Sequence, residues 1–236
     1  DDRQNSYLLL DYIFRVRRLS HLAVLRVNDR DGRVGIAHVM RAARRLNHPV
    51  VIEQRFENGS TDFSEQLDSI GHTNADALFL LGNPGELGLI VKAVRERGMA
   101  LPIFAFDRCI HPKFLDAAGA AADGVIATAT FNPDRNDPAW LDFQRRYRER
   151  FGEEPGAFSA HAYDGTNLII AAIRAAGLNR ARIRDALFAN QRFDGVTGTI
   201  EFDSTQNNVR KPWLAEVKSG RFHFFRSDEP AGGHGG

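Results

Sequence analysis

The chain has 236 residues, of which 31 are Lys or Arg and 30 are Asp or Glu, and the net charge of +1 argues against functions such as nucleic-acid binding that need a strongly basic surface. Its 43% hydrophobic and 26% charged residues are typical of a folded globular protein. No apolar run reaches the roughly 18 residues of a membrane helix, and the first residues do not have the pattern of a secretion signal.

Residues 21–129 alternate short apolar runs with longer amphipathic stretches, which predicts strands joined by crossover helices in a parallel sheet. The predicted strands cover residues 22–27, 50–54, 77–81, 102–106 and 124–129. The predicted helices between them cover residues 32–46, 62–70 and 84–97. Asp62 is the expected cap of the second helix, and Glu65, three residues on, would complete a capping box.

A polar segment with a proline near each end, residues 132–138, indicates a linker and a domain boundary. Helices are predicted after it at residues 139–151, 160–176 and 180–189, with Asn179 as the cap of the last. The helix over residues 160–176 is apolar nearly all round, which predicts burial on most sides. A strand with glycine bends over residues 195–203, a hairpin formed by residues 213–217 and 221–225, and a disordered tail complete the prediction.

The sequence offers little support for catalysis. It has neither a glycine-rich phosphate loop nor a nucleophile elbow, and its eight histidines are too scattered for a zinc site, so we expect no cofactor, metal or catalytic group. Cys109 follows a predicted strand beside Arg108, an environment that favours a lowered thiol pKa, although a single cysteine is more often inert. The basic runs at residues 15–18 and 145–150 fit exposed helix faces, so nucleic-acid contact is only a minor alternative.

Loops at the carboxyl ends of parallel strands are the default place for a ligand site in such a sheet. Here they are residues 29–32, 82–85 and 107–111, which carry Asp, Asn and Arg side chains. These groups suit a small charged or zwitterionic molecule, and no nucleophile and base accompany them. A binding role is therefore favoured over an enzyme, while the first of these loops is also compatible with a simple solvated turn.

Several runs of the sequence, in this order and spacing, resemble one family. They are residues 56–64, 75–80, 95–98, 118–125, 162–165 and 195–203. Together they resemble the solute-binding proteins of branched-chain amino-acid (Leu/Ile/Val-type) ABC transporters, which have the type I periplasmic-binding fold. The resemblance covers residues 1–225.

The resemblance implies an α/β fold in which a doubly wound parallel sheet forms the second lobe and a helical segment returns to an incomplete first lobe. The implied divisions are residues 1–130 for the second lobe, 131–203 for the returning segment, 204–226 for a hairpin that completes the second lobe, and 227–236 for the tail. Most of the first lobe would be missing, which would explain why the three late helices have no evident sheet to cover. Their apolar faces would then be exposed unless the chain forms a homodimer, repacks or meets a complementary piece.

The resemblance also implies site positions. Family members that bind leucine-like amino acids place a tyrosine, a second aromatic residue and a glutamate in the second lobe, and the matching positions here are Asp31, Asn83 and Asp107. Asp107 keeps the carboxylate that pairs with the ligand's ammonium group. The other two positions replace aromatic walls with polar groups, which argues against a branched aliphatic ligand and for a more polar or partly cationic one.

Two further positions are candidates for ligand contact. Phe158 matches an aromatic position of the returning segment and would form a wall of the site, with a core position beside Tyr163 as the alternative. Arg108, like Arg30, would bind a ligand carboxylate or pair with neighbouring aspartates, and the pairing is slightly favoured.

The function implied by the resemblance is that of a periplasmic or extracellular solute-binding protein, which captures an amino acid or similar polar solute between two lobes and delivers it to an ABC permease. With one jaw of the clamp missing, binding should be weak. Two other classes stay open: a ligand-sensing domain of a receptor or transcriptional regulator, and an enzyme that uses Asp31 and Asp107 as an acid and base.

Overall fold

The computed structural model describes residues 2–227, which form two compact units. The sheet unit consists of residues 2–130 and 212–227, and the helical unit consists of residues 131–211. Residues 204–211, which the sequence analysis joins to the final hairpin, group with the helical unit. Most of the tail that was expected to be disordered, residues 228–236, lies outside the described residues.

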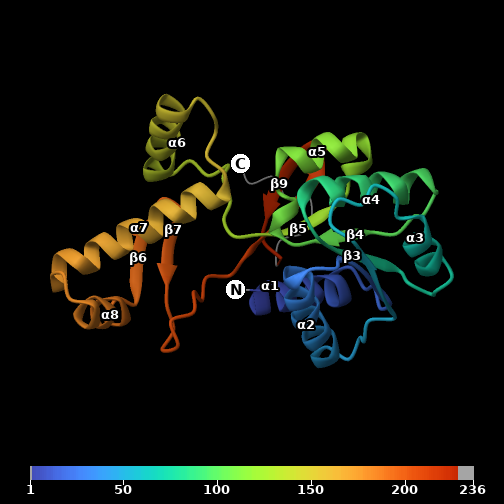
Figure 1. The fold of residues 1–236 in the computed structure, drawn as a ribbon, viewed down its shortest axis with the longest axis horizontal. Coiled ribbons are helices and arrows are strands. Elements are labelled where there is room, and N and C mark those ends of the chain that lie inside the picture. Colours follow the sequence, from blue (N-terminus) through green and yellow to red (C-terminus); the bar gives the residue numbers. More distant parts are fainter. Residues whose placement is uncertain (1, 228–236) are drawn as a thin grey trace. The chain divides into compact units, whose positions relative to one another are not determined.

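The sheet unit is built on seven strands in the order β2-β1-β3-β4-β5-β8-β9 (Figure 1). The strands are β1 (Leu22–Val27), β2 (Ile52–Phe56), β3 (Ala77–Leu81), β4 (Ile103–Ala105), β5 (Ile126–Ala129), β8 (Trp213–Lys218) and β9 (Arg221–Phe225). The first five strands of the chain pair in parallel, and β8 and β9 add an antiparallel hairpin beside β5. The predicted parallel sheet and final hairpin are therefore confirmed.

Helices cover both faces of this sheet because its inner parallel strands β1, β3, β4 and β5 are buried along their whole length. The helical segments are α1 (Asp2–Asp11), η1 (Tyr12–Val16), α2 (Arg30–Arg45), α3 (Ser64–Gly71), α4 (Pro84–Glu96), η2 (Asp107–Cys109), α5 (Pro112–Ala118) and η3 (Gly119–Ala122). Alternate residues of β1 enter two different cores. Leu25 packs with α3, α4 and α5, whereas Val24 packs with α1, η1 and α2.

The structure corrects several details of the sequence analysis. The second strand begins two residues later than predicted, at Ile52. Asp62 is not the cap of α3, because the cap position is Phe63. The Asp62 carboxylate instead accepts a hydrogen bond of 3.0 Å from the amide of Ser64, the first residue of the helix. The helical segments α1, η1 and α5 have no counterpart in the prediction, which starts at residue 21 and has no helix between residues 106 and 124.

One charged pair lies within the sheet itself. Arg26 on β1 is buried, and its Nε donates a hydrogen bond of 2.7 Å to Glu53 on the neighbouring strand β2. Arg55 donates to the same Glu53 oxygen at 3.1 Å. Burial raises the pKa of Glu53, but the hydrogen bonds from the two arginines outweigh burial, so that its pKa lies below the usual range.

We expect Glu53→Gln to lower the free energy of unfolding of the sheet unit by about 1–2 kcal/mol at neutral pH, because a charge-assisted acceptor of buried Arg26 is lost. A lowered pKa in the folded state contributes stability above the unfolded pKa of about 4.3, and this contribution disappears as the pH falls through the folded value. In a Trp140→Phe background, urea titrations followed by Trp213 fluorescence should therefore show the gap between the chains with and without the Glu53→Gln change closing in acid. Glu65→Gln on the exposed surface of α3 is the control, and a gap independent of pH would contradict the assignment.

The helical unit contains three helices and a two-stranded sheet. Its elements are α6 (Pro138–Phe151), α7 (Ala157–Ala176), α8 (Arg180–Ala189), β6 (Arg192–Gly195) and β7 (Gly198–Glu201). The predicted cap at the start of α8 is present, since the Asn179 side chain accepts from the Arg182 amide at 3.1 Å. Helix α6 ends at Gly152, which adopts a left-handed conformation. Its core is small and contains Phe131, Trp140, Phe143, Ala160 and Val196.

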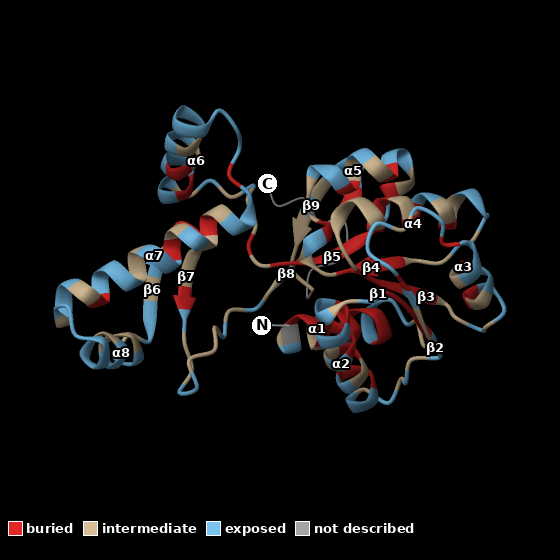
Figure 2. Ribbon diagram, viewed as in Figure 1, coloured by how far each residue is buried: buried red, intermediate tan, exposed pale blue. Residues whose placement is uncertain are grey.

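Two predictions for the helical unit are wrong. The single bent strand over residues 195–203 is in fact part of the hairpin β6–β7, because Gly195 and Gly198 flank a two-residue turn. Helix α7 is not buried on most sides: Ala160, Asp164 and Ala172 are its buried residues, and most of its surface is exposed (Figure 2). Its apolar residues thus exceed what the two-stranded sheet and the other helices of this unit cover.

The turn between β6 and β7 is fastened to α7 by one buried carboxylate. Asp164 accepts hydrogen bonds from the Val196 amide at 2.7 Å, the Thr197 amide at 2.9 Å and the Thr197 hydroxyl at 2.7 Å. A side chain at Gly195 would collide with this carboxylate, so the absence of a Cβ there permits the close approach. The contact joins residues more than 30 positions apart in the sequence.

Candidate functional site

Three loops of the sheet unit meet at the carboxyl ends of β1, β3 and β4, which are neighbours in the sheet. They enclose a cavity of about 280 Å³. Its charged lining comes from Arg30, Asp31, Asp107 and Arg108. The strand-end loops named in the sequence analysis as the default place for a ligand site therefore lie together, and the cavity is a candidate ligand site.

The first of these loops is shaped by the start of α2. The Asp29 side chain caps the helix by accepting a hydrogen bond of 2.8 Å from the Gly32 amide. This hydrogen bond is the main cause that lowers the pKa of Asp29. Gly32 lies against the main chain of Val27, where a Cβ atom would collide with the carbonyl oxygen. The loop is thus a tight, capped turn that directs Asp31 into the cavity.

An ion pair links two of the three loops across the cavity. Arg108 Nη2 lies 2.6 Å from Asp31 Oδ2, and Arg108 Nη1 donates to Asn83 Oδ1 at 3.4 Å. Both side chains of the ion pair are about half exposed, at 47% for Arg108 and 58% for Asp31. The alternative in which Arg108 pairs with a neighbouring aspartate is thus the one observed, and Arg30, which also lines the cavity, supplies a second guanidinium group.

Asn83 has a structural task in addition to its place near the cavity. It is the cap residue of α4 and forms a capping box with Glu86, whose carboxylate accepts from the Asn83 amide at 3.4 Å. Its side-chain amide donates to Asn58 and Glu86. The sequence analysis assigned Asn83 to the ligand but did not find this capping box.

Asp107 begins η2, directly after β4, and lines the cavity with its side chain partly exposed. The adjacent Cys109 is fully buried in the core, and burial raises the pKa of its thiol, with the Asp107 carboxylate adding to the rise. The lowered pKa suggested by the neighbouring Arg108 is therefore wrong, because burial of the thiol dominates. Cys109 is a packing residue in this fold.

The cavity also has apolar walls that the sequence analysis did not assign to a site. Phe106, Val34, Leu81 and Leu87 line it, and the ring of Phe106 packs edge-on against Phe79 at 5.0 Å between centroids. The sequence analysis predicted Phe106 as the last residue of a strand. Its position at the strand's carboxyl end, next to Asp107, was the signal that it lines the same cavity. An aromatic wall is thus present without an aromatic residue at position 31 or 83.

Phe158 belongs to the helical unit, at the start of α7, and 77% of it is exposed. The alternative of a core phenylalanine beside Tyr163 is therefore wrong. The role of Phe158 as a wall of the ligand site stays a prediction. Asp31 and Asp107 line one cavity, as an acid–base pair would require, but the Asp31 carboxylate is engaged by Arg108.

Within the part of the chain that the structure describes, no group of three or more His, Cys, Asp or Glu side chains is arranged to hold a metal ion. Between residues 2 and 227, no helix combines the length and apolar character needed to span a bilayer. What the cavity offers is a pair of carboxylates, a pair of guanidinium groups and an aromatic wall. This arrangement can bind a small molecule that carries both charges by ion pairs and hydrogen bonds.

Comparison with known proteins identifies the family. A family model described as periplasmic binding protein matches residues 1–221. The chain belongs to the periplasmic binding protein family. Among curated relatives of this periplasmic binding protein, the Leu/Ile/Val-binding protein homolog 2 of Brucella abortus is 25% identical over 217 residues, covering 84% of the chain and 58% of the relative. The chain thus spans somewhat more than half the length of that relative.

Solved structures agree on the fold. The leucine-binding protein LivK of Thermotoga maritima has a TM-score of 0.84 at 24% identity, with 95% of this chain and 65% of that one covered. LivJ of Streptococcus pneumoniae, whose structure contains isoleucine, has a TM-score of 0.79 at 26% identity, with 94% and 64% covered. The α/β fold of the type I periplasmic-binding class, expected from the resemblance, is confirmed.

Proposed function

We propose that this chain is part of the extracytoplasmic solute-binding component of an ABC uptake transporter, and that the cavity of the sheet unit binds an amino acid or similar small polar solute. The observation that carries the proposal is the set of charged side chains at the carboxyl ends of β1, β3 and β4. Membership of the periplasmic binding protein family supports it, as do relatives named for binding leucine, isoleucine and valine. The proposed location is the periplasm, and the proposed partner is a membrane permease.

The charges of the cavity suggest how a zwitterion would be held. Asp107 would accept hydrogen bonds from the ammonium group of the solute. Arg108 would balance the Asp31 carboxylate, leaving Arg30 in the cavity lining for an anionic group of the solute. The volume of about 280 Å³ lies at the lower end of the range for small-molecule sites, which suits a ligand of amino-acid size.

The exposed position of the cavity's ion pair sets the expected affinity. Because Asp31 and Arg108 are about half exposed, water competes with the solute for both of them. We therefore expect binding in the millimolar range by the chain alone. The whole site of a two-lobed binder would also exclude water from the second side of the solute.

Asp107→Asn should weaken solute binding about tenfold, because a neutral amide replaces the charged acceptor of the ammonium group while the side-chain shape is kept. The measurement is a titration of isotope-labelled chain with leucine, asparagine and lysine, followed by amide chemical shifts. Asp116→Asn on the exposed surface of α5 removes the same charge elsewhere and should bind as wild type does. Shift changes confined to residues outside the three loops, or equal affinity in both variants, would contradict the proposed site.

A further inference from the structure

The outer face of α2 consists almost entirely of arginine. Five arginines of this helix are exposed: Arg30, Arg33, Arg41, Arg44 and Arg45. At 3.6 residues per turn they fall within an arc of about 120°. The opposite side of the helix is fixed in the core by Ile36, Val39 and Ala43, so this row points away from the sheet. We call these five residues the arginine face.

Carboxylates do not balance the arginine face. Asp31 is the one acidic residue of α2, and it is paired with Arg108. Among residues 3–227, whose side chains the structure describes, no carboxylate forms an ion pair with the first four arginines of the face. The fifth, Arg45, lies over the ring of Tyr7 at 5.2 Å from its centroid, a contact that keeps its positive charge.

This charge pattern opposes helix stability. Arg41 is three and four residues from Arg44 and Arg45, spacings at which like charges repel on a helix surface. Arg30 lies in the first turn, where the helix dipole disfavours a cation. Arg44 and Arg45 lie in the last turn, where the helix dipole favours cations, but no ion pair within α2 offsets the repulsion from Arg41 or the charge of Arg30. This imbalance points to an external anion as the partner of the face.

We propose that the arginine face binds the surface of a membrane that contains anionic phospholipids. The row from Arg30 to Arg45 is about 22 Å long at 1.5 Å per residue and lies on a single convex helix, so all five guanidinium groups can approach a plane together. Lipid phosphates supply such a plane of anions, and guanidinium groups bind phosphate with paired hydrogen bonds. The inference is independent of the solute site.

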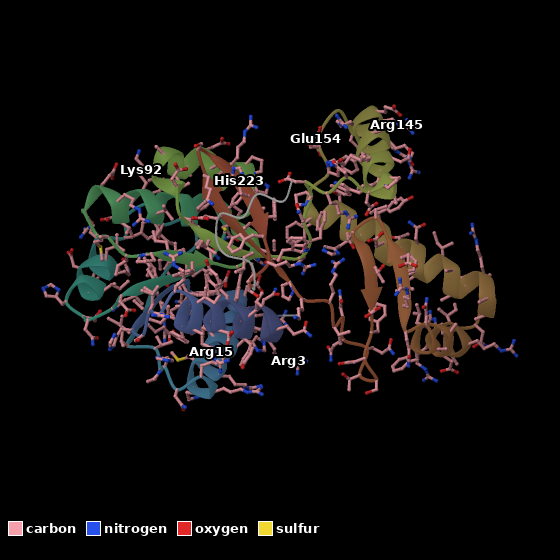
Figure 3. All side chains as sticks on the ribbon, turned by 180° about the vertical axis from the view of Figure 1, so that it is seen from behind. Arg3, Arg15, Lys92, Arg145, Glu154 and His223 are labelled. Carbon is pink, nitrogen blue, oxygen red and sulfur yellow. The ribbon has the colours of Figure 1, made fainter. Side chains whose placement is uncertain are left out.

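A membrane fits this face better than a protein partner does. The centre of a specific protein interface is formed by apolar and aromatic anchors, but Val34 and Ala37 are the only exposed apolar residues beside the arginines on α2. The basic segment of residues 15–18 adjoins the end of the helix, since Phe14 stacks on His48 at 4.4 Å between ring centroids, although Arg15 is paired with Asp11 at 3.1 Å. Arg15, just after Phe14, is exposed in the part of the sheet unit that carries α1 and α2 (Figure 3).

The experiment measures sedimentation of the chain with vesicles at low and at near-physiological salt. We expect binding to vesicles made of equal parts phosphatidylcholine and phosphatidylglycerol, little binding to phosphatidylcholine alone, and weaker binding as salt rises. The triple variant Arg33→Gln, Arg41→Gln and Arg44→Gln should reduce the partition coefficient roughly 100-fold, at about fivefold per arginine. These three positions do not line the solute cavity.

The matched control removes three exposed arginines from the helical unit, by Arg174→Gln, Arg180→Gln and Arg182→Gln. It should bind vesicles nearly as wild type does, and circular dichroism should show that both variants stay folded. Equal loss of binding in the two variants would overturn the proposal, as would binding that ignores phosphatidylglycerol. Tighter binding to heparin or single-stranded DNA than to the anionic vesicles at the same salt would also overturn it, by assigning the face to another polyanion.

Discussion

Replacing Asp164 by Ala is expected to lower the free energy of unfolding of the helical unit by about 4 kcal/mol. The buried carboxylate accepts three hydrogen bonds from the β6–β7 turn, two of them from main-chain amides. Alanine would leave these donors buried without an acceptor, and each unsatisfied donor is costly. Because the core of this unit is small, a loss of this size should leave much of the unit unfolded at room temperature.

The chain provides a separate reporter for each unit. Of its two tryptophans, Trp140 lies in the core of the helical unit and Trp213 lies in β8 of the sheet unit. In a Trp213→Phe background, Trp140 fluorescence should report early unfolding in urea for Asp164→Ala. Asp194→Ala removes an exposed carboxylate from the same hairpin and is the control. A shift of the same size in the control would refute the role given to the buried carboxylate.

The second large effect is expected for Gly32→Ala, which should destabilise the sheet unit by about 3–5 kcal/mol. A Cβ atom at this position would collide with the carbonyl oxygen of Val27, which belongs to the inner strand β1 and cannot move without disturbing both of its neighbours. The start of α2 would have to shift, and the Asp29 cap and the Asp31–Arg108 ion pair would shift with it.

The control is Gly85→Ala in the first turn of α4, where an added Cβ meets no atom within 4 Å. This variant should be neutral or slightly more stable, since alanine is the better helix former. Urea unfolding followed by Trp213 fluorescence compares the two variants, and amide shifts of the cavity loops report the ion pair. Equal midpoints for both variants would show that the turn at Gly32 relaxes freely.

The sequence was informative where one force dominates. The strands 22–27 and 77–81 were predicted with their observed bounds, because continuous apolar runs of that length fit a sheet buried on both faces. The start of α4 was equally clear, since Pro84 suits a first helical position. Arg97 and Gly98 marked the other end of this helix. The position of the cavity followed from strand order alone, because loops at one edge of a parallel sheet must meet.

Features that depend on distant residues were not predictable. Nothing local shows that Arg108 will reach Asp31, 77 positions away, rather than face a ligand, or that Asp164 will fasten a turn 32 positions on. The apolar composition of α7 predicted burial, but a helix is buried only where other segments pack against it. The arginines of α2 can be read from the sequence, but only the structure shows that they lie opposite the side of the helix that packs in the core.

The order of the strands also has a consequence for biosynthesis. Ala129 of β5 pairs with Trp213 of β8. The edge of β5 that faces β8 therefore has no partner strand until about 80 further residues have left the ribosome. At 5–20 residues per second this delay lasts about 4 to 16 s. A sheet that formed before β8 became available would expose unpaired amide and carbonyl groups that another polypeptide could occupy. For the extracytoplasmic location proposed above, folding should therefore wait until both strands are present together.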